Sequence, residues 1–482
     1  GGGGAGGDDA LTAIIGGHDA GLMVRGFAAA LSDETILVQR GILDLLLSAL
    51  PLDSASLLGC TPPDRVLLAR AALGVVLRRD LSLSRRLYTW LLGPSDSSEQ
   101  QLAFLRAHGL DLLAAALRDE MRAEGARGFK VFISLLDKWE IGALLTERCV
   151  VDAAKALKVK LEGGEGEGSA GGAGGDELLM TGNMLLEVLD PFLLWRQLYD
   201  ALRAELDPER DQHSTAPAAA VHVVELARFV VRTFRMHDDE VLRLHAPVVA
   251  FALLDLVHER VGASPSSSAE PRAETLAAAV TLATELLAEV PPAFFAPSPS
   301  AHSPEGAGGK DALTGAALAA ALYAAPPSSP SASPNPDAAT SPPGPPPIDA
   351  RALLSAGLAR ALALVESSTD ARVPQLLHPA ARAIDLLLDL AAEAGGPVID
   401  VGGGWDPAAW TEGVLERLAG REASVARFGA DRELVRLVLR LSGAGGVRPG
   451  IRGQGRVAEA LAEKVRWSYL PLPLVSWRAE LS

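Results

Sequence analysis

Apolar residues recur at intervals of three and four along most of this chain, and this spacing constrains its fold more than any other feature. In residues 38–52 the apolar positions would share one face of a helix that ends at Pro51. These positions are Ile42, Leu43, Leu46, Leu47 and Leu50. The same spacing is found in residues 66–77, 102–117, 221–234, 248–257 and 381–390, and strong two-residue alternation is absent. The sequence therefore predicts many helices of about 10 to 20 residues.

The composition indicates how such helices would pack. The chain is 48% hydrophobic but only 5% aromatic, so Ala, Leu and Val must fill its interior, which favours closely packed helices over a β-sandwich. Its 482 residues exceed the roughly 250 to 300 at which a single core stops growing. We therefore predict an all-α fold: an irregular α-solenoid of HEAT/armadillo-like antiparallel helix pairs, with disordered low-complexity insertions. No exact repeat period is visible, and a globular helical bundle would give similar stripes.

Changes in composition divide the sequence into segments. Runs of Gly, Pro, Ser and Ala have too few large apolar groups to offset the entropy of an ordered chain. Within the longest of these runs, residues 313–325 are rich in Ala and Leu and predict a short helix. The predicted segments are a flexible Gly-rich start at 1–10, helices at 11–160, a flexible Gly-rich insertion at 161–177, further helices at 178–290, a disordered linker at 291–348 and a C-terminal helical segment at 349–482.

Charge and reactive residues argue against several classes of function. A net charge of −16 disfavours nucleic-acid binding, which needs a basic face. The two cysteines, Cys60 and Cys149, lie outside any metal-binding spacing, and we expect them to be reduced and buried. We predict no metal site, no cofactor, no catalytic residue and no enzyme. No uninterrupted apolar segment reaches the roughly 18 residues needed to cross a bilayer, so membrane association should be peripheral.

One motif carries an alternative, enzymatic interpretation. Residues 398–406, VIDVGGGWD, are similar to the first motif of S-adenosylmethionine-dependent methyltransferases, in which a strand delivers a Gly-rich turn to the cofactor. That fold needs alternating strands and helices, whereas the residues that follow here continue a helical pattern. A surface loop between helices is the interpretation we favour.

A basic segment is the main candidate for a binding site. Arg78, Arg79, Arg85 and Arg86 fall within residues 76–93 of an otherwise acidic chain, on a helix that Ser82 or Ser84 would cap and that Gly93 would end. The arginines would either pair with neighbouring carboxylates, with Asp80 and Asp137 as candidates, or bind an anionic lipid headgroup or an acidic partner helix.

Two tryptophans are candidate anchors. Trp139 lies among charged residues and would be either a packing anchor or an exposed protein contact, and we favour packing because large aromatic side chains are usually buried. Trp195 follows Pro191, which suits the first turn of a helix, and should pack with Leu193, Leu194, Leu198 and Tyr199.

Four blocks, in residues 38–52, 76–93, 129–142 and 178–200, resemble in sequence and in order the N-terminal region of the Dopey (Dop1) family. Members of this family are much longer, so we expect this chain to be a fragment or a truncated gene model. The resemblance implies a large cytosolic scaffold for vesicle-mediated protein transport between endosomes and the Golgi. It also implies a Mon2-type partner, support for lipid flippase complexes, and a peripheral position on Golgi and endosome membranes. A helical repeat protein of an unrelated assembly would share the fold without these partners.

Overall fold

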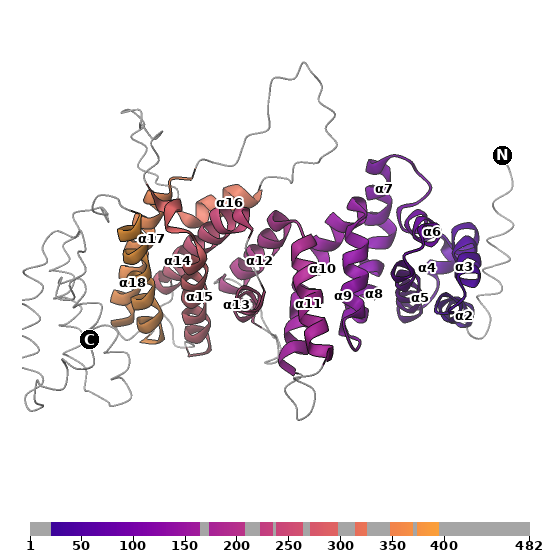
Figure 1. Cartoon of the computed structure of the whole chain (residues 1–482), viewed down its shortest axis with the longest axis horizontal. Coiled ribbons are helices and arrows are strands. Elements are labelled where there is room, and N and C mark those ends of the chain that lie inside the picture. The colour runs from indigo at the N-terminus through magenta and orange to yellow at the C-terminus, as the bar shows by residue number, and fades with distance from the viewer. Residues whose placement is uncertain are drawn as a thin grey trace, which may run out of the picture. The chain divides into compact units, whose positions relative to one another are not determined.

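The computed structural model describes residues 21–163, 173–207, 222–234, 238–263, 270–296, 314–324, 348–369 and 374–394, drawn as coloured ribbons in Figure 1. These residues form helices and, within the described ranges, no strand, so the all-α prediction is confirmed. The chain divides into two units, of which unit 1 holds residues 1–198 and 232–235, and unit 2 holds residues 199–231 and 236–482.

Unit 1 is a succession of helices that each pack on near neighbours. Helix α2 packs on α5, α3 on α6, α5 on α8, α8 on α9 and α10, and α9 on α11. Contacts between successive layers are the packing of a helical solenoid. The helices are α2 (Leu22–Leu31), α3 (Ile36–Ala49), α4 (Ala55–Leu58), α5 (Pro62–Gly74), α6 (Leu81–Leu92), α7 (Ser98–Phe104), α8 (Leu110–Arg122), α9 (Arg127–Leu136), α10 (Trp139–Gly163) and α11 (Ala173–Val188).

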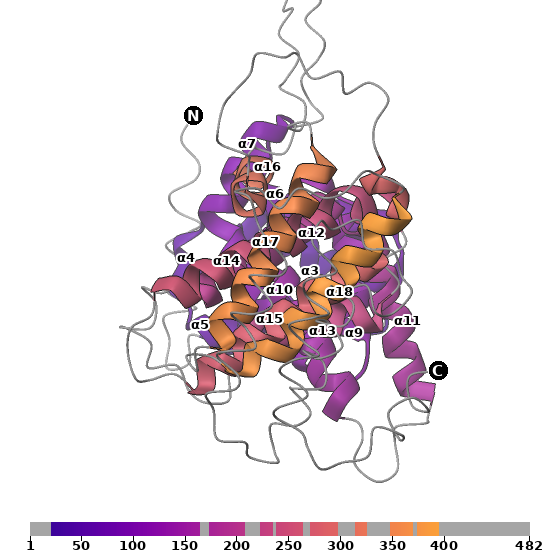
Figure 2. The same cartoon turned by 90° about the vertical axis from the view of Figure 1, so that its left-hand side faces the viewer.

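Unit 2 is built around α14 (Ala246–Ala263), which packs on α15 (Glu270–Glu289), α16 (Gly315–Ala324) and α17 (Ala350–Thr369). Helix α18 (Leu377–Glu393) lies beside α17, as Figure 2 shows, and also contacts α15. Helix α16 is the short helix that the sequence predicts in residues 313–325. The helices α12 (Pro191–Leu206) and α13 (Val223–Thr233) each contribute residues to both units.

Among the described residues, one unbroken helical stretch has the length and apolarity of a membrane span, and the bent pair α11 and α12 passes the same test only when taken together. Residues Val241–Gly262, which cover α14 except its last residue, reach a mean hydropathy of 1.6. The expectation from the sequence concerned uninterrupted apolar segments, and Arg243 and Asp255 interrupt this one. The hydropathy has a structural cause, because 72% of the apolar window is buried against neighbouring helices. A helix that is apolar on all sides is what the centre of a helical unit requires.

The remaining predictions for this fold have different outcomes. Cys60 and Cys149 are free and buried, as expected, and burial raises the pKa of the Cys149 thiol to about 11, which keeps it in the unreactive protonated form. Helix α10 extends to Gly163 and α11 begins at Ala173, so helix enters the range 161–177 from both sides. The segment boundaries stay predictions. The motif in residues 398–406 lies outside the described residues.

Glycine permits a close helix contact in each unit. A Cβ placed on Gly128 of α9 would lie 2.5 Å from the Met121 backbone nitrogen of α8. In unit 2, a Cβ placed on Gly315 of α16 would lie 2.5 Å from the Phe251 carbonyl carbon of α14. Backbone atoms cannot move aside as a flexible side chain can, so any larger residue at either position would force the helices apart.

These contacts predict opposite effects for two glycine-to-alanine changes in unit 1. Gly128→Ala should lower the free energy of unfolding by about 1 to 3 kcal/mol, because the added methyl overlaps the α8 backbone. Gly41 lies inside α3, and nothing is within 4 Å of its Cβ position. Gly41→Ala should therefore raise the free energy of unfolding by about 0.5 to 1 kcal/mol. Urea denaturation followed by circular dichroism measures both, and equal effects of the two changes would contradict the close contact.

Candidate functional site

The arginine segment begins at a sharp turn before α6. A short 3₁₀ helix ends at Arg78, and Arg79 then adopts a left-handed conformation with φ of 55°, the only such non-glycine among the described residues. Asp80 follows, and its Oδ1 accepts a hydrogen bond of 2.9 Å from the Leu83 amide. The prediction that Ser82 or Ser84 caps this helix was wrong, because Asp80 occupies the capping position directly before the first helical residue.

The buried face of α6 determines which of its residues point outward. Leu83, Leu87, Trp90 and Leu91 are buried, as predicted, and the Trp90 indole donates to the Leu50 carbonyl oxygen at 2.9 Å. The exposed residues Leu81, Arg85 and Thr89 follow one another at intervals of four and lie on the opposite face. Gly93, with φ of 76°, ends the helix as expected.

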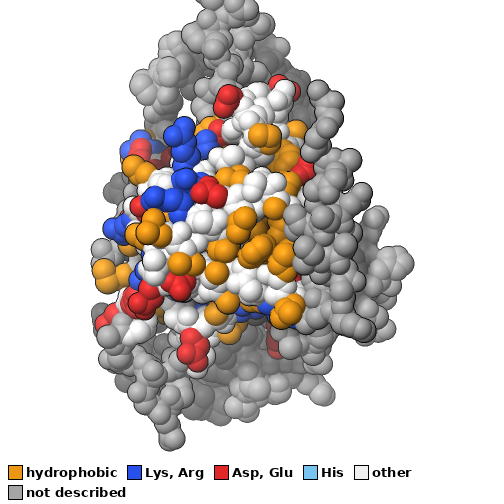
Figure 3. Space-filling model, turned by 90° about the vertical axis from the view of Figure 1, so that its right-hand side faces the viewer, with side chains coloured by type: hydrophobic (Ala, Val, Ile, Leu, Met, Phe, Trp, Pro, Cys, Tyr) orange, Lys and Arg blue, Asp and Glu red, His pale blue; other side chains and the backbone are white. Residues whose placement is uncertain are grey.

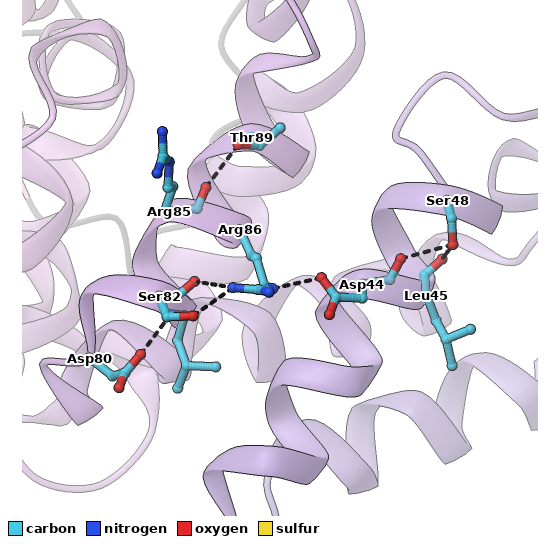
Figure 4. Close-up of polar contacts among 9 residues, drawn as sticks. Asp44, Leu45, Ser48, Asp80, Ser82, Arg85, Arg86 and Thr89 are labelled. Carbon is cyan, nitrogen blue, oxygen red and sulfur yellow. Dashed lines mark hydrogen bonds and ion pairs between the residues drawn. The ribbon is translucent and has the colours of Figure 1, made fainter.

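Arg86 and Arg78 hold α6 and its preceding turn against other elements. Arg86 Nε lies 2.6 Å from Asp44 Oδ1 on α3, and its Nη1 donates to Ser82 Oγ at 2.5 Å, as Figure 4 shows. Arg78 Nη2 donates to the Asp33 carbonyl oxygen at 3.1 Å. The prediction of a paired arginine is therefore right for Arg86. Its expected partners were wrong: Asp80 serves as a helix cap, and within the described ranges no ion pair joins these arginines to Asp137.

Arg79 and Arg85 are different, because both are exposed and neither guanidinium has a partner among the residues that the structure describes. Only the Arg85 carbonyl oxygen is engaged, by the Thr89 hydroxyl at 2.9 Å. Figure 4 shows the Arg85 side chain directed away from Arg86 and Asp44. The four arginines thus separate into two that hold the fold and two that are available to a ligand.

Exposed leucines lie on α6 and on α3, which packs against it. Leu81, between Arg79 and Arg85 in sequence, is 88% exposed. Helix α3 exposes Leu37 by 72% and Leu45 by 46%. Figure 3 views this end of the molecule and shows hydrophobic side chains gathered on it, with a group of Lys and Arg side chains beside them. We name Arg79, Leu81 and Arg85 the arginine face. Such a surface offers positive charge and apolar contact together.

Trp139 lies apart from these elements, at the first position of α10, and its side chain is 40% exposed. The turn between Leu136 and α10 buries Glu140, the residue after Trp139, and leaves Trp139 at the surface. The prediction that Trp139 packs in the core was therefore wrong. Lys138 Nζ lies 2.8 Å from one Glu140 oxygen, and Ser98 Oγ donates to the other at 3.2 Å. Burial opposes ionisation of Glu140, but these contacts and its own backbone amide lower its pKa overall.

A second buried carboxylate gave no signal in the sequence. Glu120 of α8 is 8% exposed and accepts two hydrogen bonds, of 2.9 and 2.8 Å, from Arg70 of α5. Its other oxygen lies 2.8 Å from Arg127 Nε at the start of α9. This carboxylate therefore links three helices. The partner arginines are 50 positions before and seven after it, so periodicity could not identify them.

The second aromatic anchor behaves as predicted. Trp195 is 2% exposed, and Leu193, Leu194, Leu198 and Tyr199 beside it on α12 are also buried. Pro191 is the first residue of that helix, the position expected for it.

The exposure of Trp139 predicts a small effect of its removal. Trp139→Ala should lower the free energy of unfolding by about 1 kcal/mol or less, because a half-exposed side chain leaves no closed cavity. Trp90→Ala is the matched control and should cost about 3 to 5 kcal/mol, because Trp90 is buried and its indole is hydrogen-bonded. Comparable losses in chemical denaturation of the two variants would show that Trp139 belongs to the core.

The layered helices define a helical-repeat protein, and comparison with known families identifies the kind. A model described as "Dopey, N-terminal" matches residues 7–96, and one described as "DOP1 middle TPR domain" matches residues 104–314. The chain belongs to the Dopey (Dop1) family. Tetratricopeptide, HEAT and armadillo repeats are all stacks of helix pairs, so the match agrees with the predicted solenoid.

Relatives in fungi and animals show the same similarity. Protein dop1 of Emericella nidulans is 30% identical over 321 residues, which cover 59% of this chain and 16% of that protein. Protein DOP1 of Saccharomyces cerevisiae is 24% identical over 261 residues, which cover 49% of this chain and 14% of that protein. Protein pad-1 of Caenorhabditis elegans is 45% identical over 105 residues, which cover 18% of this chain and 4% of that protein. The chain thus spans less than a fifth of each of these relatives. No solved structure matches it.

Proposed function

We propose that the chain belongs to a non-enzymatic scaffold of the Dopey type that acts in vesicle-mediated protein transport between endosomes and the Golgi. The observation that carries this proposal is the match to two consecutive family models, which together extend from residue 7 to residue 314. The stacked helices support it, because solenoids present long outer surfaces on which several proteins can assemble. The expected partners are a Mon2-type trafficking protein and a lipid flippase complex.

The scaffold would act in the cytoplasm, as a peripheral protein on Golgi and endosome membranes. Anionic lipid headgroups, such as phosphoinositides, are the ligand that we propose for the arginine face. Arg79 and Arg85 supply charge that no described residue neutralises, and Leu81 beside them is 88% exposed. Each basic residue near an anionic membrane contributes about 1 kcal/mol, so two arginines provide only weak attachment. Membrane residence would then also require the protein partners, which supply a second attachment.

A lipid-binding test can be confined to the two arginines that the structure leaves available. Arg79→Glu together with Arg85→Glu should reduce binding to phosphoinositide-containing phosphatidylcholine vesicles at least tenfold, because both attractions become repulsions. Arg78 and Arg86 stay unchanged, so the contacts to Asp33 and Asp44 remain. Vesicle flotation measures binding, and circular dichroism verifies the fold.

The matched control makes the same charge change elsewhere in unit 1. Arg122 and Arg148 have side chains that are 71% and 53% exposed, and their replacement by Glu should leave vesicle binding nearly unchanged. Equal losses in both double variants would indicate a response to net charge only, and unchanged binding of the folded Arg79/Arg85 variant would remove the lipid proposal.

The scaffold itself is tested by its partners. Affinity purification with the full-length protein as bait, followed by mass spectrometry, should recover a Mon2-type protein. Its repeated absence would contradict the transport function and would favour a helical scaffold of another assembly.

A further inference from the structure

Helix α11 has two apolar faces, although a helix at the surface of a helical stack needs only one. Its inner face buries Leu178 and Leu185, and Leu189 directly after the helix is also buried. Its outer face exposes Met180 by 67%, Met184 by 53% and Val188 by 48%. These three residues follow at intervals of four, so they form one continuous stripe along the helix. We name Met180, Met184 and Val188 the methionine stripe.

Carboxylates border the methionine stripe on both sides. At 100° per residue, Glu187 falls on one side of the stripe and Glu177 on the other, and Asp176 continues the stripe one turn before Met180. Asp176 and Glu187 are exposed, and no partner for either carboxylate exists in the described part of the chain. Glu177 Oε1 lies 2.5 Å from Lys130 Nζ of α9. The stripe therefore lies in an acidic setting that the fold neutralises only on one side.

The residue type of the stripe suits binding of another helix. Methionine is unbranched and polarisable, so exposed methionines adapt their shape to apolar side chains of a partner. The chain has only five methionines in 482 residues, and two of them stand one turn apart here. If this face of α11 only met solvent, exposed methionines would bring no advantage, because polar residues would keep the protein more soluble.

We propose that the outer face of α11 docks a basic amphipathic helix of another protein. That helix would place apolar residues at intervals of three and four against the methionine stripe, and Lys or Arg on its flanks opposite Asp176 and Glu187. The stripe extends over about 12 Å, so three turns of partner helix would cover it. This inference rests on the proposed scaffold function, to which it adds one class of protein partner. It uses none of the arginine-face residues.

The charge of the border argues against other occupants. An anionic membrane would repel the free carboxylates, so the stripe is unsuited to lipid headgroups. A second copy of the chain, paired symmetrically through this face with the two helices antiparallel, would bring the carboxylates of one copy against those of the other, and like charges in contact are unfavourable. A basic helix satisfies both the apolar and the charged residues.

Methyl NMR on the whole chain tests the proposal directly, with [¹³C-methyl]methionine as the label and single Met→Leu variants for assignment. The probe is a synthetic 18-residue amphipathic peptide with Leu at intervals of three and four and Lys on the flanks. The Met180 and Met184 methyl resonances should shift in a saturable way with micromolar affinity, and the buried Met121 resonance should not. A peptide of the same design with Glu in place of Lys should bind at least tenfold more weakly.

Variants locate the binding on α11. Met180→Glu with Met184→Glu should weaken the basic peptide at least tenfold, and Asp176→Lys with Glu187→Lys should remove the preference for Lys over Glu. Leu37→Glu with Leu45→Glu, an equal change on the exposed face of α3, should leave affinity unchanged. No shift of Met180 and Met184 at about 1 mM peptide, equal binding of both peptides, or methyl shifts caused by anionic vesicles instead would each overturn the proposal. None of these results depends on Arg79 or Arg85.

Discussion

Close contact between neighbouring helix backbones is the constraint on which both units depend. An interior with few aromatic residues has to be filled by Leu, Ala and Val, and these side chains exclude space only if the helices approach closely. Glycine supplies two such approaches, where Gly128 meets the α8 backbone and Gly315 meets that of α14. Since the inner faces serve packing in this way, ligands and partners are left with the outer faces of the helices.

The outer faces of unit 1 carry two different chemical characters. The arginine face combines positive charge with an exposed leucine, although the chain as a whole carries a net charge of −16. The methionine stripe has carboxylates along its borders. Electrostatic complementarity selects partners by sign, so one unit can present two surfaces that do not compete for the same ligand. The scaffold that we propose, which would bring a membrane and a protein together, requires such a division.

The sequence predicted what depends on local periodicity and residue chemistry. It identified the buried face of α6, the burial of Trp195, the short helix α16 and the family, because each is encoded in a short run of residues. It did not identify the Arg86–Asp44 ion pair or the Arg70–Glu120 ion pair, whose members are 42 and 50 positions apart. The exposure of Trp139 also depended on its neighbours, because the turn before α10 determined which residue faced inward.

Helices α6 and α11 each pack through one face and leave a second face, charged in α6 and apolar in α11, exposed to solvent. Hydroxyl-radical footprinting of the intact chain, read residue by residue with mass spectrometry, tests it most directly because Met and Trp react fast wherever solvent reaches them. The account predicts rapid oxidation of Met180, Met184 and Trp139 and strong protection of Met121, Trp90 and Trp195. Protection of Met180 and Met184 equal to that of Met121 would contradict it, because α11 would then have no free face.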